Sequence, residues 1–362
     1  MKIEFVDLKK QYLSIKKEID SSISRVIDES AFIKGKYVEE FEQKYSKKYG
    51  AKYVISCANG TDAIYIALKS LGIGVGDQVI TTALSWISTS ETISQTGAKP
   101  VFVDIEPNYF SIDTSKIEEK ITNKTKAIIP VHLYGHPAKM DKIIDLAKKY
   151  DLKIIEDCAQ AHFAEFNNKK VGTFGDFGTF SFFPGKNLGA YGDAGCIITD
   201  DHNLAQNARM YANHGGLKKH DHQIEGINSR LDGIQASILS TKLNYIDQWT
   251  ELRIEHAKRY SELITNHEIL LPETAENCKH VFHLYVVKSK KRDELKKILY
   301  KNNISYGIHY PSPLPLLKAY KYLNHDKLDF PIASKHSEQI LSLPIFPELT
   351  EKQMNYIATN LN

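Results

Sequence analysis

The sequence predicts an α/β protein with a large domain around a mostly parallel central sheet and a smaller α+β unit near its C-terminal end. Two observations support this prediction. Between residues 50 and 200, short runs of apolar and β-branched residues alternate with stretches whose apolar residues recur at helical spacing. Beyond residue 230, a long helical stretch leads into a region with fewer strand-like runs. A regular alternation of strand and helix favours a parallel sheet covered on both faces.

The elements of the large domain follow one another in a simple order. Strand-like runs occupy residues 53–56, 78–82, 100–103, 125–130 and 153–156. Helical spacing occurs at residues 61–71, 86–96 and 140–150. Gly72 and the glycines after it follow a helix and precede a strand, which is the reverse of a dinucleotide-binding fingerprint. We therefore interpret them as a helix end and a turn.

The second unit begins within a helical stretch expected at residues 232–264. A strand at 283–287 and a helix at 292–302 follow it. Since 362 residues exceed the size of one ordinary core, we expect two domains, residues 1–245 and 246–362.

Composition excludes several classes of protein. Acidic and basic residues are interspersed and the net charge is +3, so no basic patch indicates nucleic-acid binding. No apolar leader or membrane-spanning run is visible, and the four cysteines are scattered, which favours a cytoplasmic protein without a membrane partner. The fourteen histidines include no HExxH motif, and we expect no metal site.

The segment from Ser181 to Gly195 places Lys186 in a glycine-rich turn between two strand-like runs. A lysine in such a turn can form a Schiff base, and Asp157, at the end of an earlier strand, can pair with a pyridinium nitrogen. These are the two protein groups that pyridoxal phosphate (PLP) chemistry most needs. Taken alone, the pattern around Lys186 favours an ordinary surface lysine in a turn. Asp157 taken alone is equally a carboxylate that caps a turn.

Other segments carry chemistry only in combination. Gly60 and Thr61 join a strand to a helix, where phosphate binds well, although the motif taken alone favours an ordinary helix cap. Trp86 could stack on a flat ring or simply pack in the core. Gln160 could reach a ring hydroxyl, and Asn228 could bind phosphate or only begin a helix.

Five segments in this order resemble the PLP-dependent nucleotide-sugar aminotransferases of the DegT/DnrJ/EryC1/StrS family. They are Asn59–Asp62, the aromatic Trp86, Glu156–His162, Ser181–Gly189 and Asn228–Ala236. The resemblance extends over nearly the whole chain. It implies the aspartate aminotransferase-like fold, known as PLP fold type I, and a homodimer with active sites shared between subunits.

The resemblance also implies a role for each site residue. Lys186 would be the catalytic residue that holds the cofactor and moves protons, while Asp157 pairs with the ring nitrogen. The other cofactor contacts that it implies are Gly60, Thr61 and Ser181 to phosphate, Trp86 and Gln160 to the ring, and Asn228 from the partner subunit. Substrate contacts are assigned to Arg230, His309 and Tyr310.

By the same resemblance, the amino group of L-glutamate passes to a nucleotide-linked keto sugar. The turn after Lys186 and the sequence Asn228-Ser-Arg230 resemble members that aminate C3. The expected substrate is a dTDP-3-keto-6-deoxyhexose, which gives a dTDP-3-amino-3,6-dideoxyhexose for amino-sugar products such as lipopolysaccharide O-antigen. Alternatives are a UDP-linked substrate, a PLP-dependent sugar dehydratase and a PLP-binding regulator without catalysis. The loop at Pro313–Leu317 departs from the family pattern. The resemblance therefore does not fix the identity of the sugar.

Overall fold

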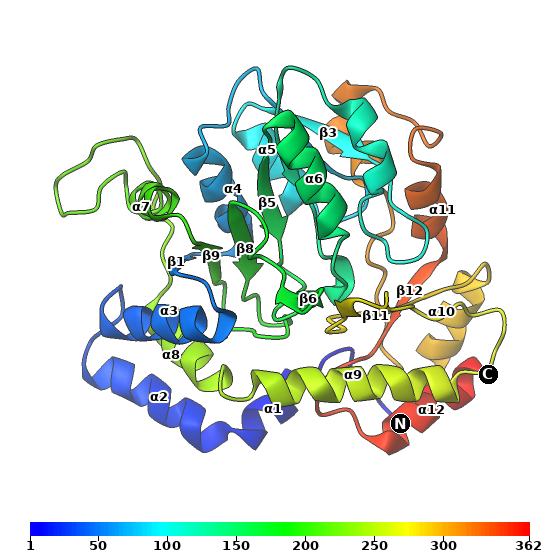
Figure 1. The fold of residues 1–362 in the computed structure, drawn as a ribbon. Helices are drawn as coiled ribbons and strands as arrows, with labels where there is room; N and C mark the ends of the chain where they lie inside the picture. Colours follow the sequence, from blue (N-terminus) through cyan, green and yellow to red (C-terminus); the bar gives the residue numbers. More distant parts are fainter.

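The computed structural model describes residues 1–362 and is organised around a seven-stranded sheet (Figure 1). The strand order is β1-β9-β8-β5-β4-β2-β3. The bounds of these strands are β1 Tyr53–Cys57, β2 Gln78–Thr82, β3 Lys99–Val103, β4 Thr125–Ile129, β5 Lys153–Asp157, β8 Phe177–Ser181 and β9 Gly195–Thr199.

The sheet is mostly parallel, as the alternating pattern predicted. Strands β3, β2, β4, β5 and β8 pair in parallel, whereas β9 runs antiparallel to both β8 and β1. The carboxyl ends of the parallel strands therefore meet along one edge, and β9 begins at that same edge. Loops at this edge are where ligands bind in open α/β sheets.

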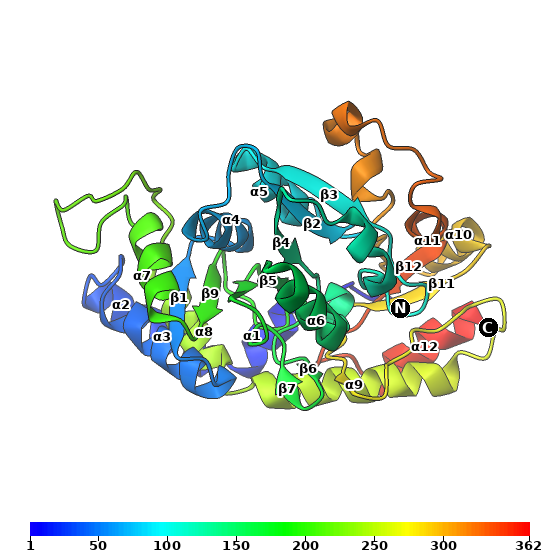
Figure 2. The same ribbon diagram turned by 45° about the horizontal axis from the view of Figure 1, so that its top comes forward.

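Helices cover both faces of the sheet because its strands are apolar on both sides. On β1, Val54 packs into the core beneath α3 and α8, while Ile55 packs into the core beneath α4 and α7. Figures 1 and 2 show helices on both sides of the strands. The covering helices are α3 Lys36–Tyr49, α4 Gly60–Ser70, α5 Ser88–Gln95, α6 Met140–Tyr150, α7 His202–Tyr211 and α8 Gly233–Lys242.

The C-terminal part has its own apolar core, formed by a two-stranded antiparallel sheet and three helices. Ile3 also belongs to this core and pairs with Ile304, so the N-terminal residues cross to the C-terminal part. The proposed division after residue 245 stays a prediction. The elements of this part are α9 Ile246–Leu263, β11 Tyr285–Lys288, α10 Arg292–Lys301, β12 Ile340–Leu343 and α12 Glu351–Leu361.

The helical stretch expected at residues 232–264 is two helices rather than one. Helix α8 ends at Lys242 and α9 begins at Ile246, although neither glycine nor proline lies between them. The two helices pack in different places: α8 contacts α2 and α3, and α9 contacts α12. Tertiary packing therefore sets this break, which the residue pattern did not reveal.

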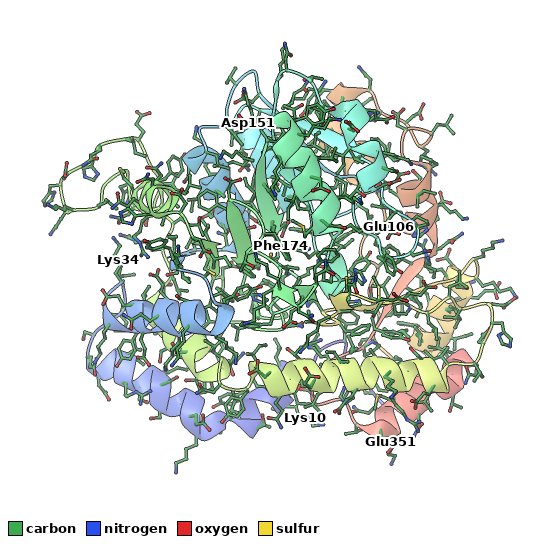
Figure 3. All side chains as sticks on the ribbon, viewed as in Figure 1. Lys10, Lys34, Glu106, Asp151, Phe174 and Glu351 are labelled. Carbon is green, nitrogen blue, oxygen red and sulfur yellow. The ribbon has the colours of Figure 1, made fainter.

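Shorter elements complete the molecule, and side chains fill the spaces between the ribbons (Figure 3). No helix is long and apolar enough to span a membrane. The remaining elements are α1 Leu8–Ser14, α2 Lys16–Asp28, β6 Glu165–Phe166, β7 Lys169–Lys170, β10 Cys278–Lys279, α11 Pro331–Gln339 and 3-10 helices at Thr114–Lys116, Glu118–Lys120, Leu133–Gly135, Leu314–Leu316 and Lys318–Leu323.

Candidate active site

A cleft of about 380 Å³ lies at the carboxyl edge of the parallel strands. Its volume is within the range of small-molecule sites. Most of the residues predicted for the site line it, although they come from distant parts of the chain. They are Gly60, Thr61, Trp86, Asp157, Gln160, Ser181, Lys186, His309 and Tyr310.

Lys186 lies on the turn that connects β8 to β9. Backbone hydrogen bonds from Phe182 to Ala194 (2.7 Å) and from Ala190 to Phe182 (2.8 Å) close this turn. Gly189 is required there, because a Cβ would lie 2.3 Å from the carbonyl oxygen of Pro184. Burial lowers the pKa of Lys186 from 10.5 to about 8, and the Asp157 carboxylate opposes this change. A larger share of neutral, nucleophilic amine is therefore present near neutral pH.

Asp157 ends β5 and is 5% exposed. Its Oδ2 accepts a hydrogen bond from Thr89 Oγ1 at 2.7 Å, and its Oδ1 accepts one from the Ala159 backbone at 3.1 Å. Burial raises the pKa of Asp157, whereas these hydrogen bonds and the nearby Lys186 act in the opposite direction. The side chain is thus a fixed carboxylate that faces a lysine across the cleft.

At one end of the cleft, the start of α4 approaches the end of β8 very closely. A Cβ on Gly60 would lie 2.6 Å from the Cβ of Ser181. Thr61 Oγ1 and Ser88 Oγ are 2.7 Å apart, and Asn59 caps the helix by accepting from the Asp62 backbone at 2.8 Å. Hydroxyl groups around an eleven-residue helix N-terminus make this end suited to phosphate.

Aromatic and amide side chains form another wall. Trp86 is 57% exposed and lies 5.7 Å, between ring centroids, from Tyr310, so it is not a core residue. Gln160 Oε1 accepts from the Tyr134 backbone at 2.7 Å, and its Nε2 donates to the Tyr310 hydroxyl at 3.0 Å. In this arrangement Gln160 holds Tyr310, and its reach toward a ring hydroxyl stays a prediction.

His309 contributes a neutral imidazole to the same wall. Its Nδ1 lies 2.8 Å from Ser342 Oγ. Burial, together with the charge of Lys186, lowers the pKa of His309 from 6.5 to about 4. At neutral pH this ring can therefore donate or accept a hydrogen bond without adding charge.

Two predicted residues lie outside the cleft. Arg230 lines a separate cavity of about 170 Å³ beside α7. Asn228 pairs with Asn213 through a backbone bridge, and Ser229, between the two predicted residues, donates to Asp62 Oδ2 at 2.6 Å. Within one chain, neither Asn228 nor Arg230 is therefore part of the wall around Lys186.

Some residues that shape the site carried no usable signal in the sequence. Thr89 is one threonine among many, and its contact with Asp157 depends on how α5 packs against α4, β2 and β3. Asn187 ties the turn of Lys186 to the C-terminal part, donating to the Val281 carbonyl at 3.0 Å. Its Oδ1 lies 3.2 Å from His283 Nδ1. Asp193 also lines the cleft. Of these residues, only Asn187 and Asp193 lie in the segment around Lys186 that resembles the family. Thr89 lies in no such segment.

Glu156, beside Asp157, anchors the segment before β8. Its carboxylate accepts backbone hydrogen bonds from Gly172, Phe174 and Gly175 at 2.7–2.9 Å. His132 Nε2 lies 3.1 Å from Glu156 Oε2. Although His132, Glu156 and Cys158 are close enough together for a metal ion, the carboxylate oxygens already accept these four contacts. We interpret the group as a structural anchor.

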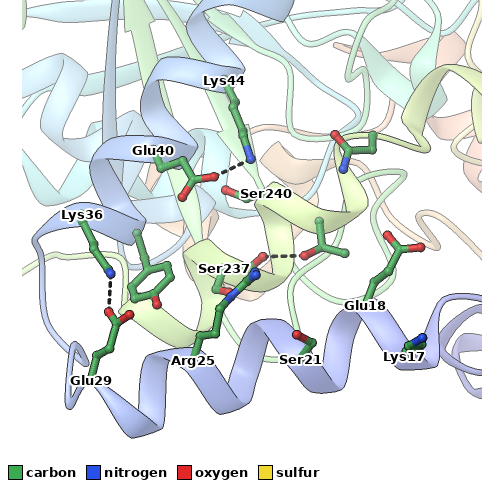
Figure 4. Close-up of a pocket in the computed structure, with 13 residues that line it drawn as sticks. Lys17, Glu18, Ser21, Arg25, Glu29, Lys36, Glu40, Lys44, Ser237 and Ser240 are labelled. Atoms are coloured by element: carbon green, nitrogen blue, oxygen red, sulfur yellow. Dashed lines mark hydrogen bonds and ion pairs between the residues drawn. The ribbon is translucent and has the colours of Figure 1, made fainter.

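A cavity larger than this cleft has a different character (Figure 4). It measures about 720 Å³, lies among α2, α3 and α8, and has only one hydrophobic residue in its wall. Its charges are largely paired, with Lys36 2.5 Å from Glu29 and Lys44 2.5 Å from Glu40. Lys36 and Lys44 are exposed and paired with carboxylates, whereas burial lowers the pKa of Lys186. We therefore place the chemistry in the smaller cleft.

The residues of the smaller cleft fit PLP. A phosphate-binding helix start, a buried carboxylate and an amine with a lowered pKa lie around one cavity. These three groups correspond to the phosphate, the ring nitrogen and the carbonyl of that cofactor. The exposed Trp86 lines the same cavity, and its stacking on a flat ring stays a prediction.

Comparisons with known proteins agree with this chemistry. A model of the DegT/DnrJ/EryC1/StrS aminotransferase family matches residues 13–362. The solved structure of DesV from S. venezuelae, in complex with a ketimine intermediate, superimposes with a TM-score of 0.97 at 38% identity, covering 99% of this chain and 97% of that chain.

Three relatives align with nearly the whole chain. A pleiotropic regulatory protein from Geobacillus stearothermophilus is 45% identical, over 100% of this chain and 98% of its own length. A dTDP-3-amino-3,6-dideoxy-alpha-D-galactopyranose transaminase from Aneurinibacillus thermoaerophilus is 43% identical, over 99% of each chain. A UDP-N-acetyl-3-dehydro-alpha-D-glucosamine 3-aminotransferase from Acidithiobacillus ferrooxidans is 40% identical, over 99% of this chain and 96% of its own.

Proposed function

The chain belongs to the DegT/DnrJ/EryC1/StrS aminotransferase family and is a PLP-dependent sugar aminotransferase, and we propose that it moves the amino group of L-glutamate to a nucleotide-linked 3-keto sugar. The observation that carries this proposal is the Lys186 amine, with its lowered pKa, facing the buried Asp157 carboxylate across a cleft with a phosphate-binding end. When bound, PLP supplies an electron sink for bond cleavage next to nitrogen.

Lys186 has two tasks in this reaction. Its amine holds the cofactor covalently before the amino donor arrives. Once released, the same amine removes a proton from the donor carbon and returns one, as general base and then general acid. A pKa of about 8 suits both directions, because neither the charged nor the neutral amine is rare near neutral pH.

Other residues orient the cofactor rather than move protons. The Asp157 carboxylate keeps a proton on the pyridine nitrogen, and Thr89 holds that carboxylate in place. With PLP bound, Trp86 would cover its ring and Gln160 would bind its hydroxyl. Phosphate is bound by the contacts assigned to Gly60, Thr61 and Ser181, which lie at the start of α4 and the end of β8.

The sugar proposed is a dTDP-linked 3-keto-6-deoxyhexose, converted to the 3-amino-3,6-dideoxyhexose. It is supported by the name of the 43% identical transaminase and by the segment from Asn228 to Arg230. The second candidate is a UDP-linked 3-keto sugar, favoured by the 40% identical relative. Comparing kcat/KM for the two carriers with the amino-loaded enzyme decides between them. An O-antigen destination for the product stays a prediction.

A homodimer with shared sites accounts for the position of Asn228 and Arg230 outside the Lys186 cleft. The chain between α7 and α8 extends away from the body of the molecule (Figure 1). It carries the exposed apolar residues Leu217 and Ile224. At its base, Asn213 bonds to Lys34, which is labelled in Figure 3. Asn228 lies beside Asn213 at this base. If the extended segment packs against the partner subunit, Asn228 would lie at the phosphate end of the partner's cleft and Arg230 near its substrate.

Mixing two defective proteins tests the shared site. Lys186→Ala and Asn228→Ala are each expected to be weak alone. If each site takes Lys186 from one subunit and Asn228 from the other, randomly mixed dimers contain one intact site in every heterodimer. Activity should then recover to about a quarter of the wild-type value. No recovery, despite subunit exchange observed by native mass spectrometry, would contradict the shared site.

The name of the 45% identical relative raises a second possibility, a PLP-binding regulator without catalysis. One experiment separates it from the enzyme. The visible spectrum of the PLP-loaded protein is recorded before and after L-glutamate, and the attached peptide is identified after borohydride reduction. We expect PLP on Lys186 and bleaching of its band by glutamate. A band that persists with glutamate and every other amino donor favours the regulator, and attachment elsewhere contradicts the assignment of Lys186.

Lys186→Ala should abolish turnover and leave the fold intact. Lys258→Ala is the control, since Lys258 is exposed and makes no ion pair.

The same proposal places the enzyme in the cytoplasm, where reduced thiols persist, because all four cysteines are free.

A further inference from the structure

A second buried lysine, Lys242, lies at the end of α8 and has no role in the chemistry described so far. It is 0% exposed and forms no ion pair, although the charge of Glu348 acts on it against the effect of burial. Its Nζ donates a hydrogen bond of 2.7 Å to the carbonyl oxygen of Gly189. The same Nζ lies 4.2 Å from the centre of the Tyr191 ring. Both partners belong to the turn that carries Lys186.

This lysine is costly to keep in the interior. Burial lowers the pKa of Lys242 from 10.5 to about 8, because the charged amine loses most of its hydration. A buried charge that has no opposite charge beside it costs free energy in a folded protein. Stability of the fold alone is therefore a poor reason for a lysine at this position, and the bond to Gly189 is the specific feature that a methionine or leucine would lack.

Gln235 holds the same turn from the same helix. Its Oε1 accepts a hydrogen bond of 2.8 Å from the backbone of Tyr191. Gly192 fits against it, since a Cβ there would lie 3.1 Å from Gln235 Nε2. Gln235 and Lys242 are seven residues apart, or two helical turns, so their side chains share one face of α8. That face is directed at residues 189–192.

The helix that provides these two contacts is itself firmly held. Ser237, on α8 between them, donates a hydrogen bond of 3.0 Å to the Ser22 carbonyl of α2. Helix α8 lies against α2 and α3, as the close-up in Figure 4 shows. The turn beyond β8 therefore rests on a fixed support rather than on a mobile surface segment.

We propose that Lys242 and Gln235 are positioning residues, which hold residues 189–192 so that the Lys186 amine faces Asp157 and the cofactor. The inference rests on the proposed function, since it requires Lys186 to be the attachment residue. Lys242 anchors a carbonyl three residues after Lys186, and Gln235 anchors the amide two residues further on. Loss of either contact lets the turn relax and moves the amine away from its productive position.

The test compares Lys242→Met and Gln235→Met with the wild-type full-length protein. The first readout is the rate at which PLP attaches to Lys186 in the cofactor-free protein, measured by borohydride trapping and mass spectrometry. The second is the unfolding midpoint of the same cofactor-free protein. The third is the single-turnover rate with glutamate and the concentration that half-saturates it. Thr241→Val is the matched control, because Thr241 adjoins Lys242 but its hydroxyl bonds to Ser237 within α8.

We expect both variants to remain folded. In Lys242→Met, the removal of a buried charge offsets the loss of the hydrogen bond to Gly189. Attachment and single-turnover rates should fall by about 10- to 100-fold, while half-saturating glutamate changes by less than about 2-fold. Thr241→Val should match the wild type. A purely structural role would instead lower the unfolding midpoint and leave the rates of the folded fraction unchanged, and that result overturns the proposal.

Two further outcomes are decisive. If Lys242→Met does not fold, Gln235→Met decides alone: a fall of about 10-fold in attachment rate supports the proposal, and an unchanged rate overturns it. If the wild type itself does not attach PLP at Lys186, the proposed function fails and this inference fails with it. Normal attachment in the wild type and in both variants removes only the positioning role.

Discussion

Replacing Lys186 by methionine should stabilise the cofactor-free protein and remove one specific part of its pH dependence. The long apolar side chain fills similar space but carries no charge. In the wild type, burial lowers the pKa of Lys186 from 10.5 to about 8 even though Asp157 opposes the change. The charged amine therefore has a higher free energy in the folded protein than in the unfolded chain.

The magnitude follows from that difference. The interval between 10.5 and about 8, at about 1.4 kcal/mol per pKa unit, gives about 3.5 kcal/mol. We reduce this value to about 2–3 kcal/mol because the side chain is only partly buried. Since the pKa of Lys186 is lowered by folding, the destabilisation is fully present below pH 8. It falls as the pH rises from 8 to 10.5, and it disappears above 10.5, where the amine is neutral in both states.

Urea unfolding of both cofactor-free proteins at several pH values between 7 and 10.5 measures this effect. The free energy of unfolding of Lys186→Met should exceed that of the wild type most at pH 7. This difference should shrink by about 2–3 kcal/mol at pH 10.5, while other titrating groups cancel in the comparison. Lys258→Met, at an exposed position, is the control. A difference between Lys186→Met and wild type that does not vary with pH refutes the reasoning.

Three further substitutions test the surroundings of the cleft. Thr89→Val removes the hydroxyl that stabilises ionised Asp157; the pKa of Asp157 should rise, and the acid limb of the glutamate half-reaction should move to higher pH, whereas an unmoved limb contradicts that contact. Gly60→Ala places a Cβ 2.6 Å from that of Ser181, which creates strain of about 1–3 kcal/mol. PLP binding, measured by absorbance titration, should weaken by about 10-fold or more, and unchanged affinity argues against a phosphate site there. Glu156→Ala leaves three backbone N–H groups without their acceptor. The free energy of unfolding, measured by urea denaturation, should fall by about 3–5 kcal/mol, and a loss below about 1 kcal/mol would show that the anchor is dispensable.

Much of the fold could be predicted because the alternation of strands and helices is local in the sequence. The strand ending at Asp157, the turn carrying Lys186 and the helix starting near Gly60 all lie where the residue pattern placed them. The break between α8 and α9 could not be predicted, because no residue there disfavours helix. It arises from different packing partners on either side.

The candidate site shows the same division between local and distant information. Lys186 and Asp157 stand in motifs that indicate their chemistry even without coordinates. Their mutual orientation depends on β5 and β8 pairing in parallel, so that both strands end at one edge. Thr89, held beside Asp157 by the packing of α5, belongs to no motif, and the support of the turn by Lys242 joins residues more than fifty positions apart.

The sequence by itself determined the α/β class, the family and the identity of the residues able to do PLP chemistry, because apolar periodicity and short motifs are properties of neighbouring residues. Only the tertiary structure decided which of them meet. It brought Gly60 against Ser181, placed Asn228 outside the Lys186 cleft, and lowered the pKa of Lys186 to about 8. Distances between segments and loss of hydration arise only when the chain packs, so they cannot be read from the order of residues.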